Sequence, residues 1–212
     1  MDSGEKVSQN SEKILDRLRD FSDGIFAFAI TLLILNLVLP YATTKADLAQ
    51  ALLQLWPKFT SFLISFIVIG LYWIIHVRQF RFVVRYNSWL LWLNLGFLLF
   101  IVLIPFSTSV LSDFFGTAGV ILYSANMACA GFMTTGLLIY TVRNKLVDKS
   151  LGPAQVKRGI IMNLVAPVMF TLSIGLAFIN ADLAAYSWIL MFFVRRAAGW
   201  IFKLPRTDDD IR

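Results

Sequence analysis

The sequence predicts an all-α membrane protein whose single domain crosses the bilayer with six helices. Of the 212 residues, 58% are hydrophobic and 15% are charged, which is not the balance of a soluble globular domain. Uncharged runs long enough to cross a hydrocarbon core of roughly 30 Å recur along the chain. Lysine and arginine collect in alternate connections between these runs, which is the pattern of cytoplasmic loops.

The predicted spans cover residues 18–40, 57–80, 88–112, 115–142, 158–180 and 183–203 of one domain, 1–212. The first five contain uncharged stretches of sufficient length. The sixth is short before Arg195 and Arg196, and it crosses the bilayer if both guanidinium groups snorkel to the interface. The connections are too short for a second domain, although 46–56 can form a short interfacial helix. No segment of the chain repeats another.

Charge placement predicts the topology. Basic residues precede the first span, separate the second from the third and the fourth from the fifth, and follow the sixth, whereas the opposite side receives only Lys45 and Lys58. By the positive-inside rule, both termini are cytoplasmic. The net charge of +6 therefore suits anionic lipid headgroups rather than nucleic acid.

Several chemistries are disfavoured by composition. One histidine, one cysteine and the lack of acidic residues in spans two to six leave no metal cluster, no carboxylate pair and no cofactor site inside the membrane. Ser22, Asp23 and His76 can be written as a triad, but adjacent helical residues point about 100° apart, which suits catalysis poorly. The chain is therefore not predicted to be an enzyme. It also lacks the arginine repeat of a voltage sensor and the Thr-Val-Gly-Tyr-Gly potassium filter.

The first span carries the most informative residues, because Arg17 and Asp23 lie at its entry. A carboxylate at bilayer depth costs roughly 2.5–3.5 kcal/mol on insertion scales, so it must face protein or water. The topology places His76, one helical turn after Trp73, at about the same depth, and Asn94 of the third span can join them. Two interpretations remain open: a hydrogen-bonded network that supports or gates the first helix, and a direct cation or proton site.

One face of the first helix forms a mostly apolar stripe with a single hydroxyl. Such a stripe can simply pack on a neighbouring helix. If four copies met on an axis, it would instead form stacked apolar rings above a polar entrance, and hydrophobic constrictions of this kind can gate by dewetting. The stripe consists of Gly24, Phe28, Thr31, Leu32, Leu35 and Leu39.

These residues resemble a known signature. Arg17-x-x-x-Phe21-Ser22-Asp23, followed by Ala27-x-Ala29-Ile30-Thr31-Leu32-Leu33-x-Leu35, is similar to the first helix of the prokaryotic branch of the transmembrane protein 175 family of potassium channels. Tyr72-Trp73-x-x-His76, Asn94 and Pro105-Phe106-Ser107-Thr108 are similar to the family's second and third helices. The resemblance covers nearly the whole chain as a six-span unit, with motifs in the first three helices.

The resemblance implies a homotetramer whose first helix lines a central pore without a re-entrant filter loop. Phe28, Leu32 and Leu35 would form apolar rings, with Thr31 near the narrowest level. The supporting network would comprise Arg17, Phe21, Ser22, Asp23, Trp73, His76 and Asn94. Two positions depart from the family pattern: Phe28 stands where an aliphatic residue is expected, and Asn36 where a carboxylate is frequent.

The sequence thus predicts a passive, potassium-preferring cation channel of a prokaryotic plasma membrane. Its partners are potassium and other monovalent cations, the lipid bilayer and further copies of the chain, with no fixed metal ion. The alternatives are a proton-permeable channel or proton-coupled secondary transporter that uses Asp23 and His76, and a non-conducting membrane scaffold.

Overall fold

The named elements of the computed structural model, which describes residues 2–38 and 45–201, are all helices. A long helix, α1 (Asp2–Leu32), continues into a 3-10 turn, η1 (Leu33–Asn36). The elements that follow are α2 (Lys45–Gln54), α3 (Trp56–Phe80), α4 (Ser88–Val102), α5 (Ile104–Asp113), α6 (Thr117–Arg143), α7 (Pro153–Ala177) and α8 (Ala181–Ile201). The predicted all-α fold is confirmed. Leu39 and the predicted span ends at residues 40, 202 and 203 lie outside the described residues.

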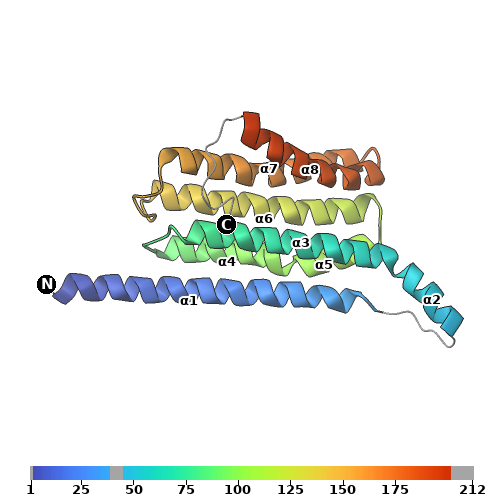
Figure 1. Cartoon of the computed structure of the whole chain (residues 1–212), viewed down its shortest axis with the longest axis horizontal. Coiled ribbons are helices and arrows are strands. Elements are labelled where there is room, and N and C mark those ends of the chain that lie inside the picture. The colour runs from blue at the N-terminus through green and yellow to red at the C-terminus, as the bar shows by residue number, and fades with distance from the viewer. Residues whose placement is uncertain (1, 39–44, 202–212) are drawn as a thin grey trace.

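Four segments are long and apolar enough to cross a membrane in the described part of the chain: α3, α4 together with α5, α6, and α7. Only Leu103 separates α4 from α5, and Pro105 lies in the first turn of α5. Proline lacks the N–H that a continuous helix needs and its ring crowds the preceding turn, which explains the break. α1 and α8 lie along the same bundle, α1 at one edge and α8 at the other (Figure 1).

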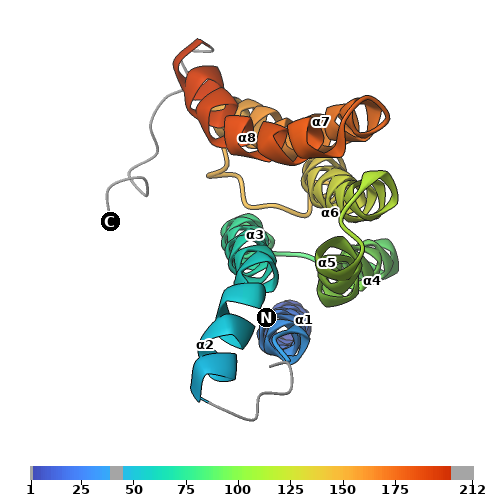
Figure 2. The same ribbon diagram turned by 90° about the vertical axis from the view of Figure 1, so that its right-hand side faces the viewer.

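The view along the helices shows how the bundle is layered. α1 lies beside α3 and the α4–α5 segment, α6 occupies the middle, and α7 with α8 covers the far side (Figure 2). α2 continues away from the start of α3 and leaves the bundle (Figure 1). α1 is therefore an edge helix, which the described chain covers on one side only.

Two loops pair at one end of the bundle, the end from which α1 projects (Figure 1). Val83 and Val147 form an isolated antiparallel bridge between the α3–α4 and α6–α7 connections. The Val84 N–H donates to the Leu146 carbonyl at 2.9 Å, and the Asp148 N–H to the Phe82 carbonyl at 2.8 Å. These bonds hold the ends of α3, α4, α6 and α7 in register.

Buried hydroxyl groups hydrogen-bond across the interior of the bundle. Thr108 of α5 donates to the Ser65 hydroxyl of α3 at 2.7 Å, and Ser65 lies 3.2 Å from the phenol oxygen of Tyr123 in α6. On the far side of α6, the Trp188 indole of α8 donates to the Ser173 hydroxyl of α7 at 2.9 Å. Each polar group thereby has a partner where water is absent, as burial requires.

Candidate functional site

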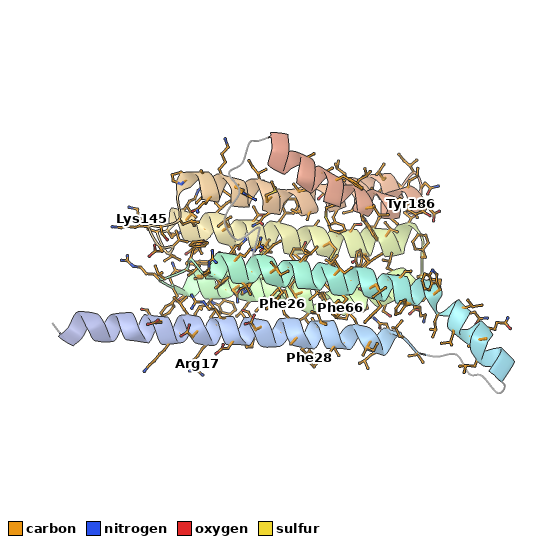
Figure 3. The ribbon with its side chains drawn as sticks, in the orientation of Figure 1. Arg17, Phe26, Phe28, Phe66, Lys145 and Tyr186 are labelled. Atoms are coloured by element: carbon orange, nitrogen blue, oxygen red, sulfur yellow. The ribbon has the colours of Figure 1, made fainter. Side chains whose placement is uncertain are left out.

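The two faces of α1 have opposite environments. Ser22, Phe26 and Ala29 are almost completely buried against the bundle, and Leu33 of η1 continues this face. A second series of large apolar residues faces outward, with exposed fractions of 51% for Phe21, 58% for Phe28, 66% for Leu35 and 68% for Val38. In Figure 3, Phe26 lies between α1 and the bundle, whereas Phe28 lies on the opposite side of the helix.

A directional chain of hydrogen bonds joins α1, α4 and α3 through buried side chains. The Ser22 hydroxyl donates to the Leu18 carbonyl at 2.8 Å, so its oxygen accepts from the Asn94 amide at 3.0 Å. The side-chain oxygen of Asn94 lies 3.0 Å from Nε2 of His76, and it accepts a hydrogen bond from the N–H at that position. This order of donors assigns the proton to Nε2 of the imidazole.

Aromatic rings enclose His76. Its imidazole stacks on Phe80 with ring centroids 4.2 Å apart and lies 5.7 Å from both Phe26 and Phe97. The side chain is 1% exposed. The histidine therefore lies in an apolar cage that contacts the buried face of α1, with the Asn94 amide as its polar neighbour.

Asp23 follows Ser22 in sequence but lies on an exposed part of α1. One carboxylate oxygen accepts a hydrogen bond from the Trp73 indole N–H at 2.8 Å, which ties α1 to α3 at a second point. Arg17 is exposed, and Figure 3 shows it pointing away from the bundle. The structure therefore brings Asp23 and Trp73 together, and it places Arg17 and Phe21 on the outward side of α1 rather than in this network.

Arg19, which the sequence motifs did not single out, anchors α1 to the end of α3. Its Nη2 donates to the carbonyls of Phe80 and Val83 at 2.9 and 3.0 Å, and its Nη1 pairs with Asp16 at 2.8 Å. Helical spacing offered a signal for this role, because Arg19 and Ser22 are three residues apart and share a face. The carbonyls it binds lie where α3 ends, so they are available to a side chain.

The four residues predicted to form the constriction lie along the outward side of α1 and η1. Phe28, Thr31 and Leu35 are exposed, and Leu32 is half-buried at their flank. The Thr31 hydroxyl donates to the Phe28 carbonyl of its own helix at 2.8 Å. This bond engages the hydroxyl proton within α1 and leaves the oxygen as an acceptor, whereas the neighbouring Phe28, Leu32 and Leu35 side chains are hydrocarbon. A Cβ added at Gly24 would meet open space, so Gly24 lies on the side of α1 that the described chain leaves uncovered.

Within the described ranges, no group of three His, Cys, Asp or Glu side chains is placed to hold a metal ion. What the described residues provide instead is a polar network that fixes one face of an edge helix, and an apolar face that the same chain leaves uncovered. This arrangement defines a class: a helical membrane bundle with one helix organised to face something beyond its own subunit.

Comparison with known proteins identifies the family within that class. Residues 17–105 match the family model described as endosomal/lysosomal potassium channel TMEM175. The chain is 30% identical over 185 residues to a potassium channel of Streptomyces collinus, an alignment that covers 84% of this chain and 90% of that relative. The chain belongs to the TMEM175 family, and it is a membrane protein. The resemblance predicted from the motifs is confirmed.

A solved structure and a vertebrate relative extend the comparison. A crystal structure of a lysosomal potassium-selective channel TMEM175 homologue from Chamaesiphon minutus superposes with a TM-score of 0.74 at 25% identity, covering 88% of this chain and 98% of that one. An endosomal/lysosomal proton channel TMEM175 of Danio rerio is 25% identical over 214 residues. That alignment covers 94% of this chain but 40% of the vertebrate protein.

Proposed function

We propose that the protein is a passive, potassium-preferring cation channel. The observation that carries this proposal is the outward apolar face of α1, on a chain whose bacterial relative is named a potassium channel and aligns over 90% of its length. The Chamaesiphon structure, which bears the name of a potassium-selective channel, supports the same function at the level of the fold.

The spacing of the outward residues supports a pore built from several copies of α1. Within α1, Phe21 and Phe28 are seven residues apart, and Gly24 and Thr31 form a second pair with the same spacing. A seven-residue repeat keeps one seam of a helix directed at partner helices that wind around a common axis. We place this seam at the centre of a homotetramer, with apolar rings at Phe28, Leu32 and Leu35 and with Thr31 near the narrowest level.

An apolar constriction discriminates between cations through dehydration. It has no oxygen ligands to replace lost water, so the cation that sheds water at lower cost passes more readily. Potassium is larger and more weakly hydrated than sodium, which gives the preference without a coordinating filter. Thr31 donates its proton to its own helix, so its hydroxyl oxygen is a single polar atom among the large apolar side chains of the stripe.

The proposed membrane arrangement has six spans. Four are the long apolar segments, the fifth is α1 together with η1, and the sixth is α8. Both termini are cytoplasmic in this arrangement, and the membrane is a prokaryotic plasma membrane. The loop pair at Val83 and Val147 supports the orientation, because the basic residues Arg81, Arg85 and Lys145 lie in the same two connections.

A proton-permeable channel or a proton-coupled transporter is the second candidate, and the name of the Danio relative favours it. In this interpretation, Asp23 and His76 carry the proton. The cage of Phe26, Phe80 and Phe97 around His76 supports a positioning role instead, since a proton carrier must exchange with water in each cycle.

Reconstitution into liposomes under opposed potassium, sodium and proton gradients tests the proposal. A potassium channel carries a current that reverses near the potassium equilibrium potential and needs no proton gradient. A current that follows the proton gradient would support the second candidate. Absence of flux from correctly assembled protein would leave only a scaffold role.

A further inference from the structure

The outer end of α1 changes from α-helix to 3-10 helix at Leu33, and this change determines which residues point outward. Residues three apart align in a 3-10 helix, because each residue turns the chain by about 120° rather than the 100° or so of an α-helix. Leu33 and Asn36 therefore share one side of η1. Leu33 is completely buried and Asn36 is half-buried, whereas Ile34 and Leu35 are exposed.

One side-chain hydrogen bond holds this turn to the neighbouring span. The Asn36 amide Nδ2 donates to the Pro105 carbonyl at 3.2 Å, in a partly buried position. Pro105 lies where α4 gives way to α5, and its carbonyl has two lone pairs, so it can accept this amide in addition to a backbone donor. Leu33 and Asn36 thus attach both ends of η1 to the bundle.

The spans at the break are themselves fixed from the other side. Asn126 of α6 donates to the carbonyl of Phe100 at 3.2 Å, near the end of α4, and lies 3.3 Å from the hydroxyl of Ser107 in α5. Asn36 therefore binds a carbonyl that is held in place, rather than one on a flexible loop.

We propose that Asn36 is a positioning residue for the constriction: its bond to Pro105 maintains the 3-10 turn and so aims Leu35 at the ion pathway. The proposal rests on the proposed function of α1 as the pore helix. If the bond is lost, η1 can return to α-helical geometry. Over the two residues from Leu33 to Leu35, that change rotates the Leu35 side chain by about 40°. The rotation turns the side chain away from its present direction without altering its chemistry.

The test compares variants that differ in the donor at position 36. Asn36→Leu keeps the branched shape and removes the N–H, whereas Asn36→Gln keeps an amide donor. Both are made with Leu35→Cys and Cys129→Ser, and the rate at which a thiosulfonate reagent modifies the thiol introduced at position 35 is measured in reconstituted channels. Asn36→Ala is measured in parallel, so that an assembly defect in the leucine variant leaves a second comparison.

The matched control is Asn180→Leu. Asn180 lies in the α7–α8 connection, where its side-chain oxygen accepts the backbone N–H groups of Asp182 and Leu183 at 2.8 and 3.0 Å. The Asn180→Leu variant loses helix-capping hydrogen bonds remote from α1, so it reports a general loosening of the fold.

We expect Asn36→Leu and Asn36→Ala to slow modification of the introduced thiol at least threefold, with Asn36→Gln within twofold of the parent and Asn180→Leu unchanged. In channels with native Leu35, we expect the potassium-to-sodium permeability ratio to fall at least threefold in Asn36→Leu and to recover in Asn36→Gln. Equal modification rates in the parent, Asn36→Leu and Asn36→Ala, or an equal slowing in Asn180→Leu, would overturn the proposal. The proposed function fails differently: modification of the introduced thiol would then leave the current unchanged.

Discussion

The two faces of α1 make different interactions, although their residues are interleaved along one helix. The buried face carries one polar residue among apolar ones, and it is packed within the chain: Ser22 hydrogen-bonds to Asn94, and Phe26 packs against the ring of His76. From Phe21 to Leu35 the outward face is mostly apolar, and the side chains of Phe28 and Leu35 are more than half exposed. The buried face therefore determines where α1 lies, and under the proposed function the outward face determines which ions pass.

Adjacent residues show how sharp this division is. Ser22 is completely buried, whereas Asp23, turned about 100° further around the helix, is exposed and bonds to Trp73 at the flank. A hydroxyl with two partners can be buried at low cost, whereas a carboxylate must stay near water or a donor. Substitutions on the two faces should therefore separate folding from conduction.

The largest expected effect comes from Asn94→Leu, which breaks the buried face. It leaves Nε2–H of His76 without an acceptor and the Ser22 oxygen without a donor, at a cost of roughly 1–3 kcal/mol for each buried group. We expect the assembled protein to be largely lost, as measured by thermal denaturation in detergent with size-exclusion chromatography.

Leu95→Ala is the matched control for this substitution, because Leu95 is the next residue of α4 and is 42% exposed. It should stay close to the wild-type transition temperature. If Asn94→Leu is as stable as this control, the hydrogen bonds of the Asn94 side chain do not hold α1 in place.

The second effect, in order of size, concerns the outward face. Leu35→Ala and Leu32→Ala remove side-chain volume from the proposed apolar rings, so single-channel conductance should rise and the potassium-to-sodium permeability ratio should fall several-fold, with little change in thermal stability. Phe178→Ala serves as the control, since Phe178 is 74% exposed at the end of α7 on the far side of the bundle. Unchanged selectivity in both leucine variants would reduce the stripe to a packing surface.

Sequence reasoning succeeded where polar residues are rare within spans. His76 and Asn94 were grouped with Asp23 by depth, and the family resemblance added Ser22. The structure joins Ser22, Asn94 and His76 in one chain of hydrogen bonds. Membrane spans favour such inference, because each polar side chain needs a partner and few are available. The all-α fold followed from the same scarcity of charge.

Sequence reasoning fell short where a residue's role depends on the direction of its side chain around the helix, or on a contact with a residue far away in the chain. Arg17 and Arg19 are two residues apart and chemically alike. Helical spacing puts Arg19 on the face of Ser22, but the packed position of α3 supplies the carbonyls that it binds. Asn36 was interpreted only as a departure from a carboxylate that is frequent in the family. Its bond to Pro105 depends on a 3-10 turn and on the α4–α5 break, and the two bonded residues are 69 positions apart in the chain.

A smaller effect is expected where the two faces meet, at Asp23. Asp23→Asn keeps an oxygen acceptor for the Trp73 indole and should assemble normally with altered flux. Asp23→Ala removes the acceptor and should lower the fraction of assembled tetramer. Trp73→Phe removes the donor, so the double variant should be no worse than either single variant, because both break one bond. Additive losses in the double variant would show that Asp23 and Trp73 act separately.

The smallest expected effect on conduction is that of His76→Gln. Glutamine keeps an N–H donor for the Asn94 oxygen, whereas it removes the only imidazole in the chain and therefore any proton transfer through one. A channel of the proposed kind does not pass protons through this cage, so its potassium current per tetramer should persist and still reverse near the potassium equilibrium potential. Loss of aromatic stacking on Phe80 should appear as lower thermal stability instead. The measurement is liposome flux normalised to assembled protein, with and without a proton gradient. If flux vanishes in tetrameric His76→Gln while wild-type flux requires the proton gradient, the buried face takes part in transport itself, and the separation of the two faces of α1 does not hold.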